Sequence, residues 1–200
     1  MTRQELINMV KTKVDEISPL DAEITPVSLM NDKPVDSFAD GLLDECAKEV
    51  LMRAPSLKVK GTQEQVEAHG NKDGSGYVVL PEGFLRLLEF RMAEWERSVT
   101  EAAEPGSAVA QMQGNRYLRG GISKPVCVYG KRGGEAVLEY YTVKKRHDVG
   151  RFVYVKEALA ENVPVELQDV LTWWCASRVL QIFGNVNGAQ LAYERGKSLL

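Results

Sequence analysis

The chain has 200 residues, of which 44% are hydrophobic and 26% charged, and this is the composition of a globular protein that can bury a substantial core. Its formal charge is -3, and its 25 basic and 28 acidic residues are scattered, which argues against tight, salt-sensitive nucleic-acid binding. Residues 1–14 mix charged and apolar positions, and no run of about 18 apolar residues occurs anywhere. We therefore expect a soluble protein, made and kept in a cytosol, with no membrane contact.

The N-terminal part of the sequence predicts two helices. Thr2 and Glu5 have the spacing of a capping box, and apolar residues then recur at helical spacing as far as Ile17. Residues 20–35 contain prolines and indicate an extended connector. A second apolar stripe over residues 42–51 predicts another helix, which Pro55 would end.

The middle of the chain, from residue 57 to residue 155, has short β-rich runs separated by glycine-rich turns. Residues 126–129 and 136–143 lie on either side of a Gly-rich turn and predict a hairpin. Alternation over residues 88–92 predicts a half-buried strand, and residues 152–155 can add another. The middle should therefore form a small antiparallel sheet.

Helical spacing returns after Pro164, with one apolar face over residues 167–175 and a stop at Gly184 before a last helix. Neighbouring positions cannot share one helix face, so Trp173 or Trp174 should meet a neighbouring element or subunit. The sequence thus predicts an α+β fold, with helices at both termini packed with a small antiparallel middle. It also predicts a single domain over residues 1–200, whose parts are residues 1–56, 57–156 and 164–200.

The three cysteines and two histidines do not suggest a metal or cofactor site. Cys46, Cys127 and Cys175 are far apart and lie among apolar neighbours, which is typical of reduced core thiols. His69 and His147 lie in polar segments bordered by glycine, without a nearby nucleophile in a recognisable frame, and we interpret both as solvated loop residues. No cofactor is expected.

The sharpest short motif covers residues 71–78 and, at its twelfth position, Glu82. It resembles an EF-hand calcium loop, because oxygen-bearing side chains occupy positions one, three and five and Gly76 would permit the sharp turn. Gly70 and Pro81 argue against the flanking helices that such a loop needs. A hairpin turn between residues 66–69 and 77–80 is the favoured interpretation, and calcium binding is the alternative.

No catalytic constellation is evident, and the chain is not expected to be an enzyme. Residues 130–134 lack the spacing and the hydroxyl residue of a phosphate-binding loop, and they indicate a hairpin turn. A carboxylate series could in principle supply an acid and a base, but on a strand it would be the solvent-facing side of the alternation. The members of this series are Glu89, Glu94, Glu96, Glu101 and Glu104.

Three segments resemble the head-to-tail connector, or ring, proteins of tailed bacteriophages. Residues 80–92 with Trp95 are similar to their proline-led entry and strand, and residues 113–121 with 138–141 to their polar-aromatic loop and hairpin. The closing residues 167–200 resemble their terminal helices. The similarity is nearest to the ring proteins of crAss-like phages and, more distantly, to the tail tubular and head-completion adaptors of short-tailed phages.

This resemblance implies a virion structural protein of the phage neck, made in the host bacterial cytoplasm. Twelve copies would close into a ring against the portal protein, contact other neck or tail proteins, and extend a channel through which DNA passes without specific binding. The long loop over residues 102–123 should contact a neighbour and be ordered by assembly. The residues predicted to form subunit interfaces are Trp95, Arg116, Tyr117, Arg119 and Trp173. The alternative is a non-enzymatic calcium- or peptide-binding interaction module.

Overall fold

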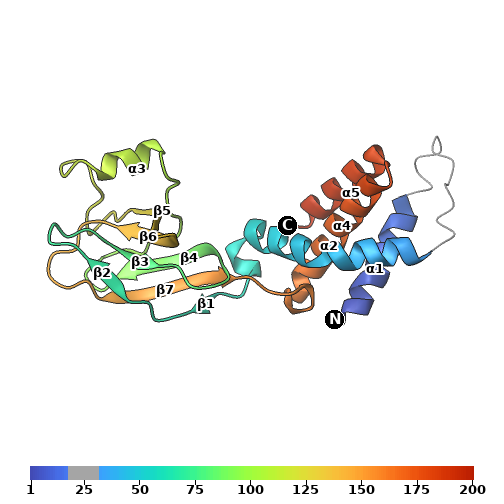
Figure 1. Ribbon diagram of the computed structural model, residues 1–200, viewed down its shortest axis with the longest axis horizontal. Coiled ribbons are helices and arrows are strands. Elements are labelled where there is room, and N and C mark those ends of the chain that lie inside the picture. The colour runs from blue at the N-terminus through green and yellow to red at the C-terminus, as the bar shows by residue number, and fades with distance from the viewer. Residues whose placement is uncertain (18–31) are drawn as a thin grey trace. The chain divides into compact units, whose positions relative to one another are not determined.

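The computed structural model describes residues 1–17 and 32–200, with side chains described in the second range from Val35 onward. Contacts divide the chain into two compact units: a helical unit, Met1–Lys60 with Glu157–Leu200, and a β unit, Gly61–Lys156. Helices at both ends and an antiparallel middle confirm the predicted α+β class (Figure 1). That the whole chain acts as one domain stays a prediction.

The helical unit contains four helices and two short 3₁₀ turns. They are α1 (Arg3–Ile17), α2 (Asp32–Arg53), η2 (Ser56–Lys58), η3 (Ala160–Asn162), α4 (Val165–Ile182) and α5 (Val186–Ser198). The capping box at the start of α1 is confirmed, since the Thr2 amide donates to the Glu5 carboxylate at 2.7 Å and the Glu5 amide to Thr2 Oγ1 at 3.3 Å.

The predicted connector over residues 20–35 falls largely outside the described residues. Its last four residues, however, form the first turn of α2, so an extended conformation was wrong there. Pro34 misled the prediction, because proline is tolerated in the first turn of a helix, where amides have no intrahelical partner.

Helix α4 is the centre of the helical unit and is buried on nearly every side. Because α1, α2 and α5 all pack against it, the single apolar face predicted over residues 167–175 was too narrow. Both adjacent tryptophans contact neighbouring helices, as expected. Trp174 stacks on Tyr193 of α5 at 5.5 Å between ring centroids, and Lys13 of α1 lies 4.9 Å from the ring centroid of Trp173.

The β unit contains two antiparallel sheets, where the sequence predicted one. The three-stranded sheet has the order β1 (Thr62–Gln63), β7 (Val149–Lys156), β4 (Phe84–Met92). The four-stranded sheet has the order β2 (Ala68–Gly70), β3 (Gly76–Val79), β6 (Glu135–Tyr140), β5 (Cys127–Arg132). The predicted strands over residues 88–92 and 152–155 are confirmed, and both sheets contribute to one core that includes Phe90, Tyr140 and Phe152.

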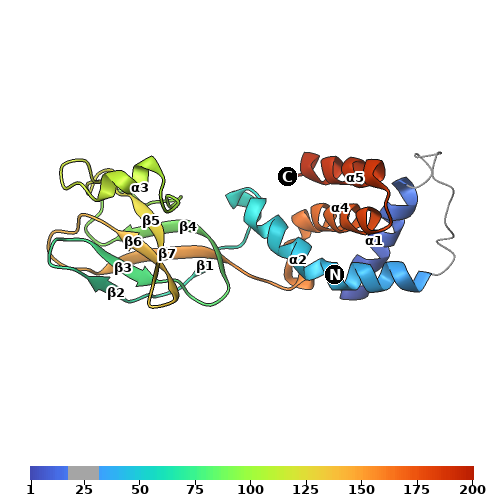
Figure 2. The same ribbon diagram turned by 45° about the horizontal axis from the view of Figure 1, so that its top comes forward.

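The predicted hairpin around residues 130–134 is confirmed as β5 and β6. Arg132 pairs with Glu135, which leaves Gly133 and Gly134 as a two-residue turn with φ of +59° and +93°. Positive φ at both positions defines a type I′ turn, the type whose twist matches the strands, and glycine adopts it without strain. Figures 1 and 2 both place the short helix α3 (Ala108–Gln113) on the side of the β unit that carries β5.

Candidate functional site

Hydrogen bonds join four loops of the β unit into one structure, which we call the loop cluster. It comprises residues 71–75, 94–97, 115–124 and 141–147. The Val143 amide donates to the Gly74 carbonyl at 2.8 Å, and Thr142 Oγ1 donates to the Gly120 carbonyl at 2.6 Å. Trp95 Nε1 donates to the Thr142 carbonyl at 3.3 Å, so this buried tryptophan supports the cluster from its core side.

Thr142 has a strained backbone at the centre of the loop cluster. Its φ is +64°, and it is the only residue other than glycine with a positive φ in the described part of the chain. The left-handed region costs an L-residue about 1–2 kcal/mol, and β-branched residues rarely adopt it. Such strain persists only where the surroundings impose it, and it concentrates at functional sites.

Glu94 fixes the conformation of the basic loop that follows β6. Its carboxylate accepts hydrogen bonds from the amides of Lys144 at 2.8 Å, Lys145 at 3.1 Å and Arg146 at 3.3 Å. These backbone hydrogen bonds, chiefly that from Lys144, hold the pKa of Glu94 below its ordinary value. The interpretation of this carboxylate as a merely solvent-facing residue was wrong, because it lies in the turn after β4 and organises a second loop.

Helix α3 and the turn that follows it carry an exposed apolar surface, which we call the α3 patch. Its residues are Val109, Met112, Tyr117 and Leu118, and Tyr117 and Leu118 are 94% and 61% exposed. A hydrogen bond beneath the patch joins the end of α3 to the turn that follows it, because the side chain of buried Gln113 accepts from the Gly120 amide at 2.8 Å. The loop thus contains a helix and a hydrogen-bonded turn within one chain, and its contact with a neighbour and its ordering by assembly stay predictions.

The helical unit has its own exposed apolar surface where α4 turns into α5. Its residues, which we call the helical patch, are Phe38, Ile182, Phe183 and Val186. The rings of Phe38 and Phe183 meet edge to face with centroids 5.8 Å apart, so the two aromatic residues form one continuous surface. Exposed apolar groups that cluster in this way mark interaction sites more often than single exposed residues do.

The five predicted interface residues are divided between the two units. Trp95 and Trp173 are buried, at 3% and 8% exposure, and serve as core residues of the β unit and the helical unit. Arg119 is half-buried, whereas Arg116 and Tyr117 are exposed. All of them except Trp173 lie in the loop cluster. Only Arg116 and Tyr117 have exposed side chains that a partner could contact.

The calcium-like motif forms the predicted hairpin turn between β2 and β3. Asp73 Oδ1 accepts hydrogen bonds from the Ser75 amide at 3.1 Å and from Ser75 Oγ at 2.6 Å, and Arg119 lies 3.5 Å from its other oxygen. Gly74, with φ of +82°, makes the turn. Glycine is required at position 76 for a different reason than the sharp turn expected there, because a Cβ at this position would lie 2.3 Å from the Tyr140 hydroxyl. The motif is flanked by strands, and no cluster of three potential metal ligands occurs among the described residues.

The two histidines have different environments. His69 is exposed on β2 and stacks on Tyr77 with centroids 4.9 Å apart. His147 is half-buried and its Nδ1 lies 2.8 Å from the Tyr140 hydroxyl, so the interpretation of this residue as a solvated loop histidine was wrong. All three cysteines are buried and free, as predicted, and burial raises the pKa of Cys127.

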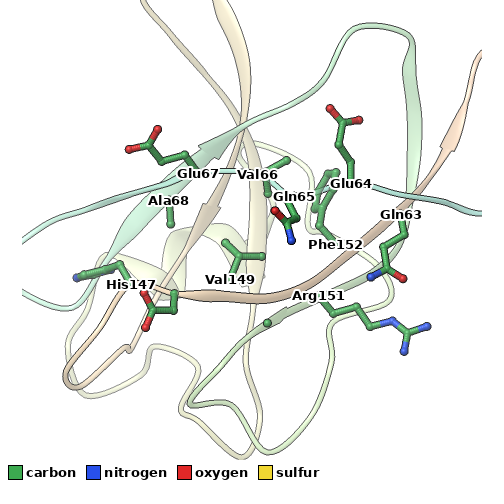
Figure 3. Close-up of a pocket in the computed structure, with 12 residues that line it drawn as sticks. Gln63, Glu64, Gln65, Val66, Glu67, Ala68, His147, Val149, Arg151 and Phe152 are labelled. Carbon is green, nitrogen blue, oxygen red and sulfur yellow. The ribbon is translucent and has the colours of Figure 1, made fainter.

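A groove of about 500 Å³ lies between residues 63–68 and residues 147–152 (Figure 3). It exists because β1 pairs with β7 only at Val153 and Tyr154, after which the chain leaves for the other sheet. Val66 and Val149, which pack against the core of the β unit, line it, together with carboxylates that include Glu67. Sequence reasoning missed this groove, since it depends on where two distant segments separate.

The chain matches no protein-family model, and no curated protein is similar to it in sequence. In the part of the chain that the structure describes, none of the helices combines the length and the apolar character needed to cross a bilayer.

Proposed function

We propose that this chain is a structural subunit of a closed ring that joins the portal to the tail of a tailed phage and extends the DNA channel. The observation that carries the proposal is the pair of exposed apolar surfaces, the α3 patch on the β unit and the helical patch on the helical unit. A ring built by rotation needs two different surfaces on each copy, one for each neighbour.

Two of the side chains considered for catalysis, Glu94 and His147, form structural hydrogen bonds. The Glu94 carboxylate is occupied by three backbone amides, and His147 is hydrogen-bonded to a tyrosine within the β unit. The exposed apolar surfaces therefore support a function in subunit contact better than any side chain of this protein supports a catalytic one.

The identities of the partners rest on the resemblance to connector proteins. Twelve copies, the portal protein, other neck or tail proteins and a place in the virion are what that resemblance implies. DNA would pass through the ring without sequence-specific contacts.

The proposal is tested on purified particles of the phage whose genome encodes this chain. Mass spectrometry should detect the chain in the virion, and symmetry-averaged electron microscopy of the neck should show a closed ring of it against the portal. Absence of the chain from the particle would overturn the proposal.

The groove in Figure 3 favours a second candidate function, a peptide-binding module. Residues 149–151, the first part of β7, have no described strand paired with them on the side that faces β1. An unpaired strand edge of this kind can accept an extended peptide. A fluorescein-labelled peptide of alternating lysine and valine should then bind and slow amide exchange at residues 149–151. Unchanged amide exchange at saturating peptide would exclude peptide binding. The other form of this alternative, a calcium-binding module, would be favoured by a rise in Tm when calcium is added.

A further inference from the structure

The loop that follows β6 presents three consecutive basic side chains. Lys144, Lys145 and Arg146 are all exposed, and none of them forms an ion pair within residues 1–17 and 35–200. The carboxylate next to them, that of Glu94, is directed at their backbone amides and holds the loop in place. The conformation of the loop is therefore fixed, and its three cationic groups form no ion pair among the described residues, although the Glu94 charge acts on Lys145 electrostatically.

Two further lysines extend this basic surface. Lys72 lies in the turn whose Gly74 carbonyl accepts from Val143, and Lys124 lies in the loop whose Gly120 carbonyl accepts from Thr142. We call Lys72, Lys124, Lys144, Lys145 and Arg146 the basic loop surface; all five are exposed.

The acidic residues of the same region do not cancel this charge. Four acids lie in the loop cluster or next to it: Asp73, Glu94, Glu96 and Asp148. Against them the same loops hold eight basic residues, because Arg97, Arg116 and Arg119 add to the five of the basic loop surface. The chain as a whole carries a charge of -3, so folding separates its charges and concentrates basic groups here. Lys144, Lys145 and Arg146 are consecutive in the sequence, whereas the nearness of Lys72 and Lys124 depends on the hydrogen bonds that join the loops.

We propose that the basic loop surface binds the phosphate backbone of duplex DNA without reading its sequence. Lysine is depleted in protein–protein interfaces, which argues against a protein partner. The exposed Tyr117 and Leu118 of the α3 patch lie in the same loop cluster and would give a bilayer an apolar anchor, but in the proposed ring a neighbouring copy covers them. The proposal rests on the proposed function in this respect and because a DNA channel would bring this ligand to the ring. Non-specific affinity of this kind is weak, with Kd on the order of 10⁻⁴ to 10⁻⁶ M at physiological salt.

The test is the salt dependence of binding, measured by fluorescence anisotropy with a labelled 30-base-pair duplex. Each phosphate contact contributes about -0.9 to the slope of log K against log salt. The variant Lys144→Ala/Lys145→Ala/Arg146→Ala should therefore reduce the magnitude of the slope by about 2.7. The charge-retaining variant Lys144→Arg/Lys145→Arg should keep the wild-type slope.

A matched control removes three basic residues that are exposed elsewhere, by Lys60→Ala/Lys131→Ala/Lys197→Ala. It makes the same change in net charge and should leave the slope unchanged. Equal losses in both triple variants, or no duplex binding at 20 mM salt, would overturn the proposal. Binding to phosphatidylserine vesicles but not to duplex would overturn it in favour of a membrane surface. Native mass spectrometry of the same samples reports ring formation separately, so a ring that does not bind DNA refutes this inference alone.

Discussion

The two units place their specific polar contacts in different locations. In the helical unit, Lys13 is only 8% exposed, and its Nζ donates to the Asp169 carboxylate at 2.7 Å and to Thr172 Oγ1 at 2.6 Å, next to central helix α4. In the β unit, the core is apolar and aromatic, and the hydrogen bonds of Glu94 and Thr142 lie in surface loops. Polar contacts therefore fix how helices pack in one unit and shape a surface in the other.

The largest expected effect is on the helical core. Trp174 is 2% exposed and stacks on Tyr193, so Trp174→Ala should lower the free energy of unfolding by about 3–5 kcal/mol. Urea denaturation measures this loss of stability. The control is Val165→Ala, at a position that is 75% exposed, and it should change the free energy of unfolding by less than about 0.5 kcal/mol. A loss below about 1 kcal/mol for Trp174→Ala would contradict the central role of α4.

Lys13 tests the buried polar contact more selectively. Lys13→Ala removes a charged donor and its packing over Trp173, and it should cost about 1.5–3 kcal/mol in urea denaturation. Lys13→Met keeps the aliphatic stem without burying a charge, so it should cost less. Burial lowers the pKa of Lys13, which agrees with a desolvated ammonium group. Equal losses in the two variants would assign the effect to the charge rather than to packing.

Thr142 provides the corresponding test in the β unit. Thr142→Val keeps the strained backbone but removes the hydrogen bond to Gly120, so it should cost about 1 kcal/mol. Thr142→Gly loses the same bond and relieves about 1–2 kcal/mol of left-handed strain, so its net change should be near zero or stabilising. Thermal unfolding compares the two variants, and a glycine variant less stable than the valine variant would show that strain is unimportant here.

Alkaline pH should weaken the β unit through its buried tyrosines. Burial raises the pKa of Tyr140, and likewise that of Tyr154, to about 12, whereas an unfolded tyrosine titrates near 10. The unfolded state therefore releases its protons first, so stability is complete below about pH 10 and is lost as the pH rises towards 12. Tyr140→Phe should reduce this slope in urea denaturations between pH 9 and 12. An unchanged slope would mean that Tyr140 does not contribute.

The smallest effect should be local to the basic loop. Glu94→Gln weakens the acceptor for three amides, so hydrogen exchange at residues 144–146 should accelerate while Tm changes little. Because the folded pKa of Glu94 is lowered, the same protection in the wild type is present at neutral pH and is lost as the pH falls through that pKa. Exchange rates that are identical in variant and wild type would show that the carboxylate does not organise the loop.

The parts of the fold set by neighbouring residues could be predicted from the sequence. The Thr2 and Glu5 capping box and the Gly133-Gly134 turn depend on a few adjacent positions, and both are confirmed. The strain at Thr142 and the groove beside β7 depend on contacts between distant loops, which no local pattern encodes. The buried states of Trp95 and Trp173 likewise depend on packing, because aromatic residues serve equally well in cores and in interfaces.

The most direct test of the ring proposal mixes two variants, each with one apolar surface removed. Tyr117→Ser/Leu118→Ser disrupts the α3 patch, and Ile182→Ser/Val186→Ser disrupts the helical patch. If the patches contact each other head to tail, each variant alone is monomeric in native mass spectrometry, the wild type forms a closed ring, and the mixture forms one-to-one pairs through its intact surfaces. If either variant still forms rings alone, or the mixture stays monomeric while the wild type assembles, the pairing of these two surfaces is contradicted.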